Sequence, residues 1–581
     1  MEPLSLLWAS GEKSTAVSFS SCCEDLELEE LSALLFPGKH GGAAFSFAET
    51  VCTADAESLQ LRQEALGILM AHPELSCALE TVRTQIGELR RCSAGIRENR
   101  QGLVGGSGMG GFKETLDKLE RLFGTRSNMI EESDLDNYCG QLFRATIFTF
   151  RLARAYTAAM GLLREVLTEE ICRSRAFERL RVWVDDIFQS DRIEEYAALL
   201  EELSSGWNGV GGFSADILVD QTMDVLGVEL SEVCPEPYCR AGAATMRGSD
   251  PWDGISGLTD FPAGGATARF QECLMTELGA SMRNSLTKLR NEVCRIPVSG
   301  LKTLLGMEEA LDFYLGAAGF CGRLRDRGLP LACPSIGTED WIDAKGVYPA
   351  SISLIRSQHP VSNDVLLPRH GAVNFITGAN SAGKTTYLIS AGQLQWLFQL
   401  GCYLPCREAQ MRPAAQVFTL FASGESDTAS DSRMGLEAEK LQVLRRHMDR
   451  ESLVLLNEPM TSTNASEGMA ICMDLLREMM AAGVSAMLVT HYNEMYGMLA
   501  RDPGTEGHLT SYVMEVDQRE DRIVYPFRLR RRYPDRSSHA QEIVSGKGLT
   551  LPAMLETLTR AGLDVRMDDD AWNTIHPEEE V

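Results

Sequence analysis

The chain has 581 residues, of which 44% are hydrophobic and 24% are charged, and its formal net charge at pH 7 is −27. This length predicts two to four domains, and the composition is that of a folded globular protein rather than a disordered one. The negative charge excludes a generally basic surface, so any contact with nucleic acid requires a local basic patch.

Residues 1–24 form an N-terminal segment without the features of a targeting signal. The run Met1–Lys13 has no basic start, and its apolar stretch is too short for a signal peptide. The 16 cysteines contain no paired CxxC motifs, which disfavours a zinc site, and many unpaired thiols indicate a reducing compartment. We therefore expect a cytoplasmic protein. The uncharged stretch Thr385–Cys406 contains three glutamines and is expected to be a buried amphipathic helix rather than a membrane span.

Residues 25–335 have mostly helical periodicity and are expected to form a mainly α-helical domain. Apolar residues recur every three or four positions in Leu59–Met70, Ala176–Leu203, Arg269–Leu289 and Met307–Arg325. Two glycine-rich interruptions, Gly102–Gly111 and Gly206–Gly212, indicate connectors between helices.

Residues 340–550 alternate apolar strand patterns with helical ones. The expected strands are Ala350–Leu354, Val373–Thr377, Gln416–Phe421, Ser452–Leu456 and Ala486–Thr490. This alternation predicts an α/β domain with a mostly parallel sheet and helices on both faces. Residues 551–581 are expected to form a C-terminal helix and an acidic tail, which is more typical of a solvated segment than of a binding site for a basic partner.

A phosphate-binding loop is predicted between the expected strand Val373–Thr377 and the expected helix Thr386–Leu400. The segment Gly378–Thr385 matches GxxxxGK[ST], in which the glycines let successive backbone N–H groups face one anion. Lys384 would contact the β- and γ-phosphates of ATP, and the Thr385 hydroxyl would bind Mg²⁺. The predicted nucleotide-binding residues are Gly378, Ala379, Asn380, Ser381, Ala382, Gly383, Lys384, Thr385 and Thr386.

Two further strands end in polar residues that complete a predicted ATPase site. The strand Ser452–Leu456 ends at Asn457 and Glu458, which places Glu458 as the catalytic base and Asn457 beside Mg²⁺. The strand Ala486–Thr490 ends at His491, which would contact the γ-phosphate or the attacking water. Each of these residues alone is compatible with a solvated strand end, but their order after the phosphate loop favours the catalytic interpretation.

The motifs resemble those of the MutS family. TGANSAGKTTY, GCYLPCREAQM, SLVLLNEPMTST and VTHYNEM are similar to the family's TGPNMGGKST, GxYVPA, SLVLMDEIGRGTST and ATHYHEL segments. His359–Val361 matches the HPV that precedes the family's ATPase strand, and residues 538–552 resemble its SYGIxVA…GLP ending. Ser58–Met70 is similar to the start of the family's helical core. The resemblance spans residues 20–555.

The resemblance implies an ATPase that acts as a dimer, with DNA held between helical levers and clamps. Thr461–Thr463 would face the other subunit, and a signature segment donated to it would fall within Glu425–Glu439. The signature serine is Ser432 if the segment's glutamate is Glu437, whereas Met434 takes that place if the glutamate is Glu439. We expect slow hydrolysis, because Asn457 replaces the family's aspartate.

The chain is expected to begin at the helical core, without the family's mismatch-recognition and connector domains. Phe112-Lys-Glu114 is interpreted as a coincidental match to the mismatch-reading motif. Two basic clusters are candidate DNA contacts, although each is more often a solvated face. The densest comprises Arg528, Arg530, Arg531, Arg532 and Arg536, and a looser one comprises Arg90, Arg91, Arg97 and Arg100.

The leading hypothesis is a dimeric, ATP-dependent DNA-binding ATPase in mismatch-repair-related or recombination processes. It would clamp mismatched, branched or otherwise altered duplex by shape. The alternative is a nucleotide-gated protein–protein scaffold with weak or no ATPase activity and no DNA ligand.

Overall fold

The computed structural model describes residues 4–13, 17–39, 42–99, 135–206, 212–221, 225–234, 266–337, 339–355, 359–421, 433–519 and 522–534, together with positions 554, 557 and 560. The chain forms two compact units. The first comprises Met1–Ser14 and Gln60–Gly319, and the second comprises Thr15–Leu59 and Phe320–Val581. Among the described residues, no helix is both long and apolar enough to cross a membrane.

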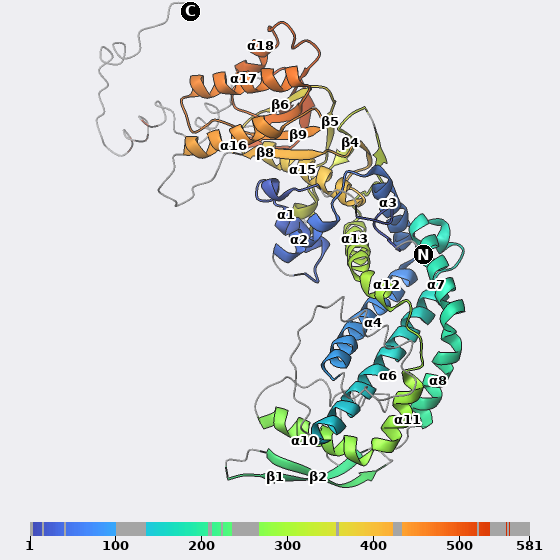
Figure 1. Cartoon of the computed structure of the whole chain (residues 1–581). Coiled ribbons are helices and arrows are strands. Elements are labelled where there is room, and N and C mark those ends of the chain that lie inside the picture. The colour runs from blue at the N-terminus through green and yellow to red at the C-terminus, as the bar shows by residue number, and fades with distance from the viewer. Residues whose placement is uncertain are drawn as a thin grey trace, which may run out of the picture. The chain divides into compact units, whose positions relative to one another are not determined.

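The first unit is a helical assembly with one β-hairpin (Figure 1). Its described elements are α4 (Pro73–Glu98), α6 (Leu135–Val166), α7 (Arg175–Asp191), α8 (Ile193–Gly206), β1 (Gly212–Val219), β2 (Val225–Cys234), α10 (Ala266–Ser281), α11 (Arg283–Val293) and α12 (Leu301–Gly306). The division between the units falls inside α3 (Ala56–Ala71) and α13 (Glu308–Asp326). At one end of the unit, Val228 of the hairpin packs in a core with α6 and α10.

The second unit contains the α/β fold. Its described elements are the short η1 (Ser20–Cys22), α1 (Leu28–Leu35), α2 (Gly42–Val51), β3 (Ser335–Ile336), β4 (Ile342–Val347), α14 (Ala350–Ile355), β5 (Asn363–Leu367), β6 (Val373–Thr377), α15 (Lys384–Leu400), β7 (Glu408–Met411), β8 (Gln416–Phe421), α16 (Arg433–His447), β9 (Ser452–Asn457), α17 (Ala465–Ala482), β10 (Ser485–Val489), α18 (Asn493–Leu499), β11 (Leu509–Met514), β12 (Asp517–Arg519), β13 (Arg522–Val524) and β14 (Leu529–Arg531).

Six of these strands form the central sheet, in the order β14-β11-β6-β10-β9-β8. The pairs from β11 to β8 are parallel, and only β14 at the edge is antiparallel. The parallel strands β6, β9 and β10 are buried along almost their whole length, as expected for strands that are covered on both faces. A second, four-stranded sheet has the order β3-β7-β4-β5.

Helices cover both faces of the central sheet (Figure 1). Val454 and Leu456 of β9 pack in one core with α17 and α18. Leu455, which points to the opposite face, lies against α15, because a Cβ atom added at Gly392 would be 2.9 Å from its side chain. The fold is therefore the expected α/β arrangement, with the carboxyl ends of β6, β9 and β10 at one edge.

α15 is buried on all sides rather than amphipathic. Its polar glutamine side chains can be buried because they make hydrogen bonds inside the protein. Gln393 and Gln399 are buried, and the amide nitrogen of each donates a hydrogen bond to a backbone carbonyl. The Gln393 Nε2 atom donates to the Leu26 carbonyl at 2.9 Å, and the Gln399 Nε2 atom donates to the Ala414 carbonyl at 3.0 Å. The Thr53 N–H also donates to the backbone carbonyl of Gln399 at 3.0 Å. The glutamines thus anchor residues 26–53 to the α/β unit, although the helical pattern had assigned this segment to the helical domain.

Ala350–Leu354, expected as a strand, is the helix α14. Pro349 precedes it, and the Pro349 carbonyl accepts hydrogen bonds from both the Ser353 N–H at 3.1 Å and the Ser353 hydroxyl at 2.7 Å. Proline favours the start of a helix because its φ is already fixed near the helical value. This local capping overrides the strand propensity of the segment.

Three features of the helical unit also differ from the expected pattern. The continuous pattern Ala176–Leu203 is divided at Arg192, which has a φ of 53°, and a second pattern is divided at Met282. The hairpin of β1 and β2 was not anticipated within the helical region. The first connector, Phe112–Glu114, the acidic tail and the segment 538–552 lie outside the described residues.

Candidate functional site

The loop between β6 and α15 has the backbone geometry of an anion-binding turn. Gly378 and Gly383 have φ values of 134° and 93°, and Ser381 has a φ of 66°. Two factors exclude a side chain at Gly378. Its Cβ atom would lie 2.9 Å from Met514, and the φ value suits only glycine. The first N–H groups of α15 have no intrahelical acceptor, as in every α-helix, and no side chain caps them.

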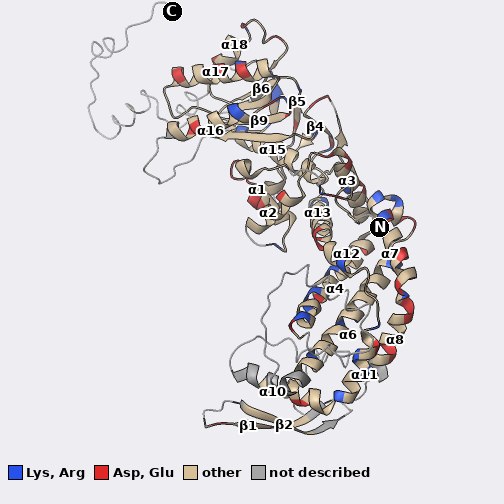
Figure 2. Cartoon of the chain, viewed as in Figure 1, with Lys and Arg blue, Asp and Glu red and all other residues tan. Residues whose placement is uncertain are grey.

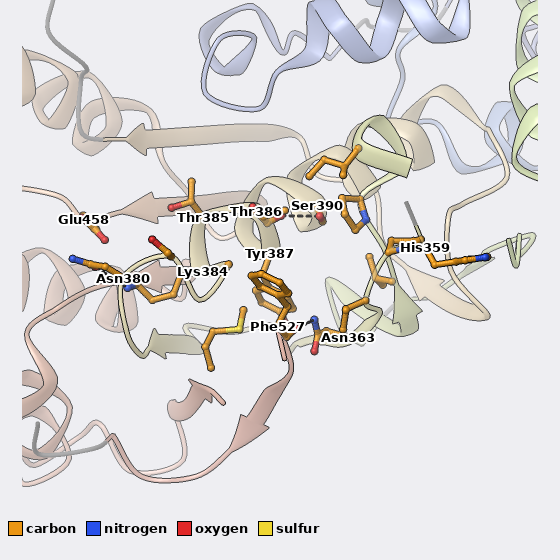
Figure 3. Close-up of a pocket in the computed structure, with 18 residues that line it drawn as sticks. His359, Asn363, Asn380, Lys384, Thr385, Thr386, Tyr387, Ser390, Glu458 and Phe527 are labelled. Atoms are coloured by element: carbon orange, nitrogen blue, oxygen red, sulfur yellow. Dashed lines mark hydrogen bonds between the residues drawn. The ribbon is translucent and has the colours of Figure 1, made fainter. Parts of the chain in front are cut away.

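Lys384 folds back over this loop, as Figure 3 shows. Its Nζ atom donates to the carbonyl oxygens of Gly378 and Ala379 at 2.9 and 3.2 Å. The side chain is buried, and burial lowers its pKa against the opposing attraction of Glu458. A phosphate oxygen would be a stronger acceptor for this ammonium group than the neutral carbonyl oxygens that now accept its hydrogen bonds.

Thr385 and Asn457 meet at the start of α15 and the end of β9. The Thr385 hydroxyl donates to the Asn457 Oδ1 atom at 3.2 Å. The two predicted metal-binding residues are therefore neighbours, although their segments are 72 residues apart. Both supply neutral oxygen atoms, which is a donor type that Mg²⁺ accepts.

Glu458 and His491 form the other contact at this edge of the sheet. The His491 Nε2 atom lies 2.7 Å from the Glu458 Oε1 atom. This hydrogen bond is the main cause of the lowered pKa of Glu458, with burial opposing it. Glu458 has a φ of 50°, and its N–H donates to the Val489 carbonyl at 2.8 Å. The strained backbone turns the carboxylate away from the strand direction and toward the loop.

The segment after Glu458 is tied to α16 by a contact that the sequence did not predict. The Ser462 hydroxyl donates to the Glu437 Oε2 atom at 2.9 Å, and the Glu437 side chain is buried. Met434 is exposed, whereas Ser432 lies outside the described residues. The assignment of the signature serine, and the orientation of Thr461–Thr463 toward another subunit, stay predictions.

A cavity of about 510 Å³ adjoins the loop. Asn380, Lys384, Thr385 and Glu458 line its polar end (Figure 3). The remaining lining is mostly apolar and includes Val347, Pro349, Ile352, Pro360, Val361 and Phe527. The HPV motif thus belongs to the same cavity as the loop.

Asn363 and Phe527 belong to this cavity but were missed by the sequence analysis. The Asn363 Nδ2 atom donates to the Phe527 carbonyl at 2.9 Å, and the Asn363 Oδ1 atom accepts from the Leu529 N–H at 2.8 Å. Asn363 therefore holds the segment before β14 against β5. A Cβ atom at Gly383 would be 3.1 Å from the Phe527 ring. No local motif marks either residue, since their pairing depends on a separation of 164 positions.

The two basic clusters differ in how many of their arginines form ion pairs with carboxylates. In α4, Arg90 pairs with Glu308, and Arg91 pairs with Glu88 at 3.4 Å. Near β14, Arg530 pairs with Glu515 at 2.7 Å, while Arg528 and Arg531 are exposed and form no ion pair with any described residue. Arg100 and Arg536 lie outside the described residues. Arginine charges near β14 are thus available for contacts with phosphate groups. Along α4, the charges of Arg90 and Arg91 are already paired with carboxylates.

Comparisons with known proteins match the α/β unit. The family model of MutS domain V matches residues 374–553. The chain is similar to DNA mismatch repair protein MutS of Leptospira interrogans, with 25% identity over 235 residues, covering 38% of this chain and 27% of that protein. It is similar to MutS protein homolog 4 of Mus musculus, with 25% identity over 204 residues, covering 35% of this chain and 21% of that protein.

A third similarity is to endonuclease MutS2 of Geobacillus thermodenitrificans, with 27% identity over 258 residues. This match covers 42% of this chain and 32% of that protein. The chain therefore matches less than a third of the length of each of these three relatives.

Proposed function

We propose, from the premise that the C-terminal part of this chain belongs to the MutS family, that the protein is an ATPase in which nucleotide controls DNA binding. The observation that carries this proposal is the convergence of the predicted site residues at one sheet edge. Lys384 lies over the loop, Thr385 contacts Asn457, and Glu458 contacts His491. Thr385 and Asn457 are 72 positions apart, and Glu458 and His491 follow two different strands.

The residues at the loop fit a bound nucleotide with Mg²⁺. The uncapped N-terminus of α15 offers N–H donors to an anion, and Lys384 adds a buried cation. Thr385 and Asn457 would hold the metal ion through neutral oxygens. When bound, Mg²⁺ neutralises charge on the β- and γ-phosphate oxygens. The apolar end of the cavity, with Phe527 and Val361, would accommodate the base.

Glu458 is proposed as the base that accepts a proton from the attacking water. His491 keeps this carboxylate ionised by donating a hydrogen bond to it. The other Glu458 oxygen is then available to orient a water molecule. Asn457 is neutral, whereas an aspartate at this position would add a negative charge beside Mg²⁺. We therefore expect slow turnover.

DNA binding and dimerisation are the further parts of the proposal. They are supported by the family membership and by the relatives named as mismatch repair and MutS proteins. The exposed Arg528 and Arg531 provide the cations for phosphate contacts. Thr461–Thr463, which follow the catalytic carboxylate, are proposed to face a second copy of the chain.

A salt titration of DNA binding, with and without Mg·ATP, tests this proposal. Fluorescent homoduplex, mismatched and branched DNA should bind with an affinity that falls steeply as salt rises, because phosphate contacts release counterions. ATP turnover should change when the preferred DNA is added. If no DNA binds at low salt and added DNA does not change the rate of ATP turnover, the DNA-binding proposal is wrong.

Two observations favour the alternative, a nucleotide-gated protein scaffold. The net charge of −27 and the neutralised arginines of α4 leave few free cations for DNA. Under this alternative, ATP binds and changes the association with a protein, while DNA has no effect at any salt concentration. The same titration therefore separates the two functions.

A further inference from the structure

α16 places one buried carboxylate against the loop that follows Glu458. The helix carries both acidic and basic residues, which are red and blue in Figure 2. Of its two carboxylates, Glu439 is exposed, whereas Glu437 is only 4% exposed. A carboxylate is rarely buried unless polar groups compensate for the loss of water. Glu437 forms no ion pair with any described residue, so its compensation comes from a hydrogen-bond donor.

Ser462 is the donor that contacts this carboxylate. Its hydroxyl donates to the Glu437 Oε2 atom at 2.9 Å, although the two residues are 25 positions apart. Burial and the negative charge of Glu437 together raise the pKa of the Cys472 thiol to about 12. Burial, Cys472 and Glu437, in this order, raise the pKa of Tyr492. Glu437 of α16 therefore lies close to α17 and to the residue that follows His491.

The loop from Glu458 to Ser462 has a strained backbone. Glu458 and Met460 have φ values of 50° and 61°, in the left-handed region that residues other than glycine rarely adopt. Such conformations persist only where the surrounding structure fixes them. Thr461 and Ser462 are exposed, so burial in a core does not fix this half of the loop.

Contacts with α17 hold the first half of the loop. The Cys472 Sγ atom donates to the Pro459 carbonyl at 3.5 Å, and Met460 is buried in the core that includes α17. A Cβ atom at Gly468 would lie 2.5 Å from the Met460 carbonyl oxygen and 3.0 Å from the Tyr492 hydroxyl. The loop therefore packs directly on α17 at Met460, whereas Glu437 of α16 holds it at Ser462.

We propose that Glu437 and Ser462 are a positioning pair, whose hydrogen bond fixes the loop 458–463 and thereby holds the Glu458 carboxylate at the nucleotide site. This inference rests on the ATPase function proposed above, in which Glu458 accepts the proton from water. The described lining of the nucleotide cavity includes Glu458 but neither Glu437 nor Ser462. The pair therefore acts on turnover through Glu458. Without the hydrogen bond, the loop relaxes toward less strained φ values and the carboxylate moves.

Steady-state ATP hydrolysis and equilibrium binding of Mg·ATP by the full-length protein test this proposal. Ser462→Ala and Glu437→Leu should each lower kcat by about 10- to 100-fold, because a small displacement of a catalytic group has effects of this size. Nucleotide affinity should be unchanged, since neither residue lines the described cavity. Ser462→Thr, which keeps the hydroxyl donor, should retain the kcat of wild type. Wild-type kcat in Ser462→Ala overturns the proposal.

Double variants show whether the pair acts as one unit and through Glu458. Ser462→Ala/Glu437→Leu should have the kcat of the single variants rather than the product of two separate losses. Adding Ser462→Ala to Glu458→Gln should lower kcat no further, because the carboxylate that the loop positions is already absent. Losses that multiply in either double variant overturn the proposal.

Urea unfolding separates a positioning role from a merely structural one. Removing one partner of a buried hydrogen bond destabilises a fold, whereas replacing both by apolar groups is close to neutral. Ser462→Ala/Glu437→Leu should therefore unfold at a higher urea concentration than Ser462→Ala, while its kcat stays low. Recovery of kcat together with stability would make the contact structural only.

The matched control is Glu478→Gln. Glu478 of α17 pairs with Arg445 of α16 at 2.7 Å, so this variant weakens another contact of α16 without touching the loop. It should hydrolyse ATP like wild type. An equal loss of kcat in Glu478→Gln and Ser462→Ala would show that any disturbance of α16 lowers turnover, and would overturn a specific role of Ser462.

The outcomes also separate this inference from the proposed function. If wild type neither binds nor hydrolyses ATP, both fail. If wild type hydrolyses ATP, Glu458→Gln loses turnover and Ser462→Ala retains it, only the positioning role fails. A Ser462→Ala defect that disappears as the protein concentration rises would place Ser462 in a contact between copies of the chain, and would also overturn the positioning role.

Discussion

The Nε2 atom of His491 lies 2.7 Å from the Oε1 atom of Glu458, although the two residues follow different strands. β9 and β10 are parallel neighbours, and the register pairs Val489 with Asn457. Glu458, directly after β9, and His491, two residues after β10, therefore lie close together. The contact joins two sequence motifs into one acid–base unit beside Lys384, and most of the predictions below concern this unit and its surroundings.

Glu458→Gln should retain nucleotide affinity and lose hydrolysis. The amide keeps the size of the side chain but does not accept a proton from water, so turnover should fall by about 10²- to 10⁴-fold. Steady-state ATP hydrolysis and nucleotide binding measure the two effects separately. Glu494→Gln, at an exposed carboxylate in the first turn of α18, is the matched control and should hydrolyse like wild type. Normal hydrolysis by Glu458→Gln would rule out its role as the base.

His491→Ala should shift the acid limb of the pH profile of kcat to higher pH. His491 lowers the pKa of Glu458, so the ionised carboxylate is present above this lowered value and is lost as the pH falls through it. Without the hydrogen bond from His491, the carboxylate is protonated at a higher pH. An acid limb that stays in place would show that His491 does not act through Glu458.

Asn457→Asp should increase the apparent affinity for Mg²⁺ in ATP turnover by about tenfold, because it adds a negative charge beside the Thr385 hydroxyl, which we propose binds Mg²⁺. Asn457→Ala, which removes the oxygen without adding charge, should weaken the Mg²⁺ response. The measurement is a Mg²⁺ titration of initial hydrolysis rates. Identical Mg²⁺ dependence in all three proteins would place the metal elsewhere.

Gly392→Ala should destabilise the α/β unit by about 1–3 kcal/mol through overpacking. The added Cβ atom would lie 2.5 Å from Leu26 and 2.9 Å from Leu455, between the N-terminal segment and the sheet. Gly322→Ala is the matched control, because nothing lies within 4 Å of its Cβ position in α13. Urea unfolding followed by circular dichroism should show a lower midpoint only for Gly392→Ala. Equal midpoints would contradict the docking of residues 26–53 on α15.

The motifs of the α/β unit could be predicted because each lies within a short local pattern. Strand patterns fix which residues reach the sheet edge, so Lys384, Asn457 and His491 were assigned from the strands and turns beside them. The strand β6 has the predicted bounds, and β9 and β10 differ from the predicted ones by one residue. The catalytic and metal-binding roles themselves stay predictions.

Features that depend on distant pairing could not be predicted in this way. Asn363 recognises Phe527 through backbone atoms, and Ser462 contacts Glu437 across a turn that has no sequence signature. The hairpin β1–β2 was missed because its exposed aliphatic residues do not alternate cleanly with polar ones. The helix α14 was missed because Pro349, just outside the apolar run, decides its conformation.

Equilibrium binding of a fluorescent ATP analogue in the presence of Mg²⁺, compared between wild type and Lys384→Ala, tests the nucleotide site most directly. Wild type should bind saturably, and unlabelled ATP should displace the analogue. Lys384→Ala should bind about 10²-fold more weakly, because a charge-assisted hydrogen bond to phosphate is lost. Absence of saturable binding by wild type, or equal affinity of both proteins, would contradict nucleotide binding at the Gly378–Thr385 loop.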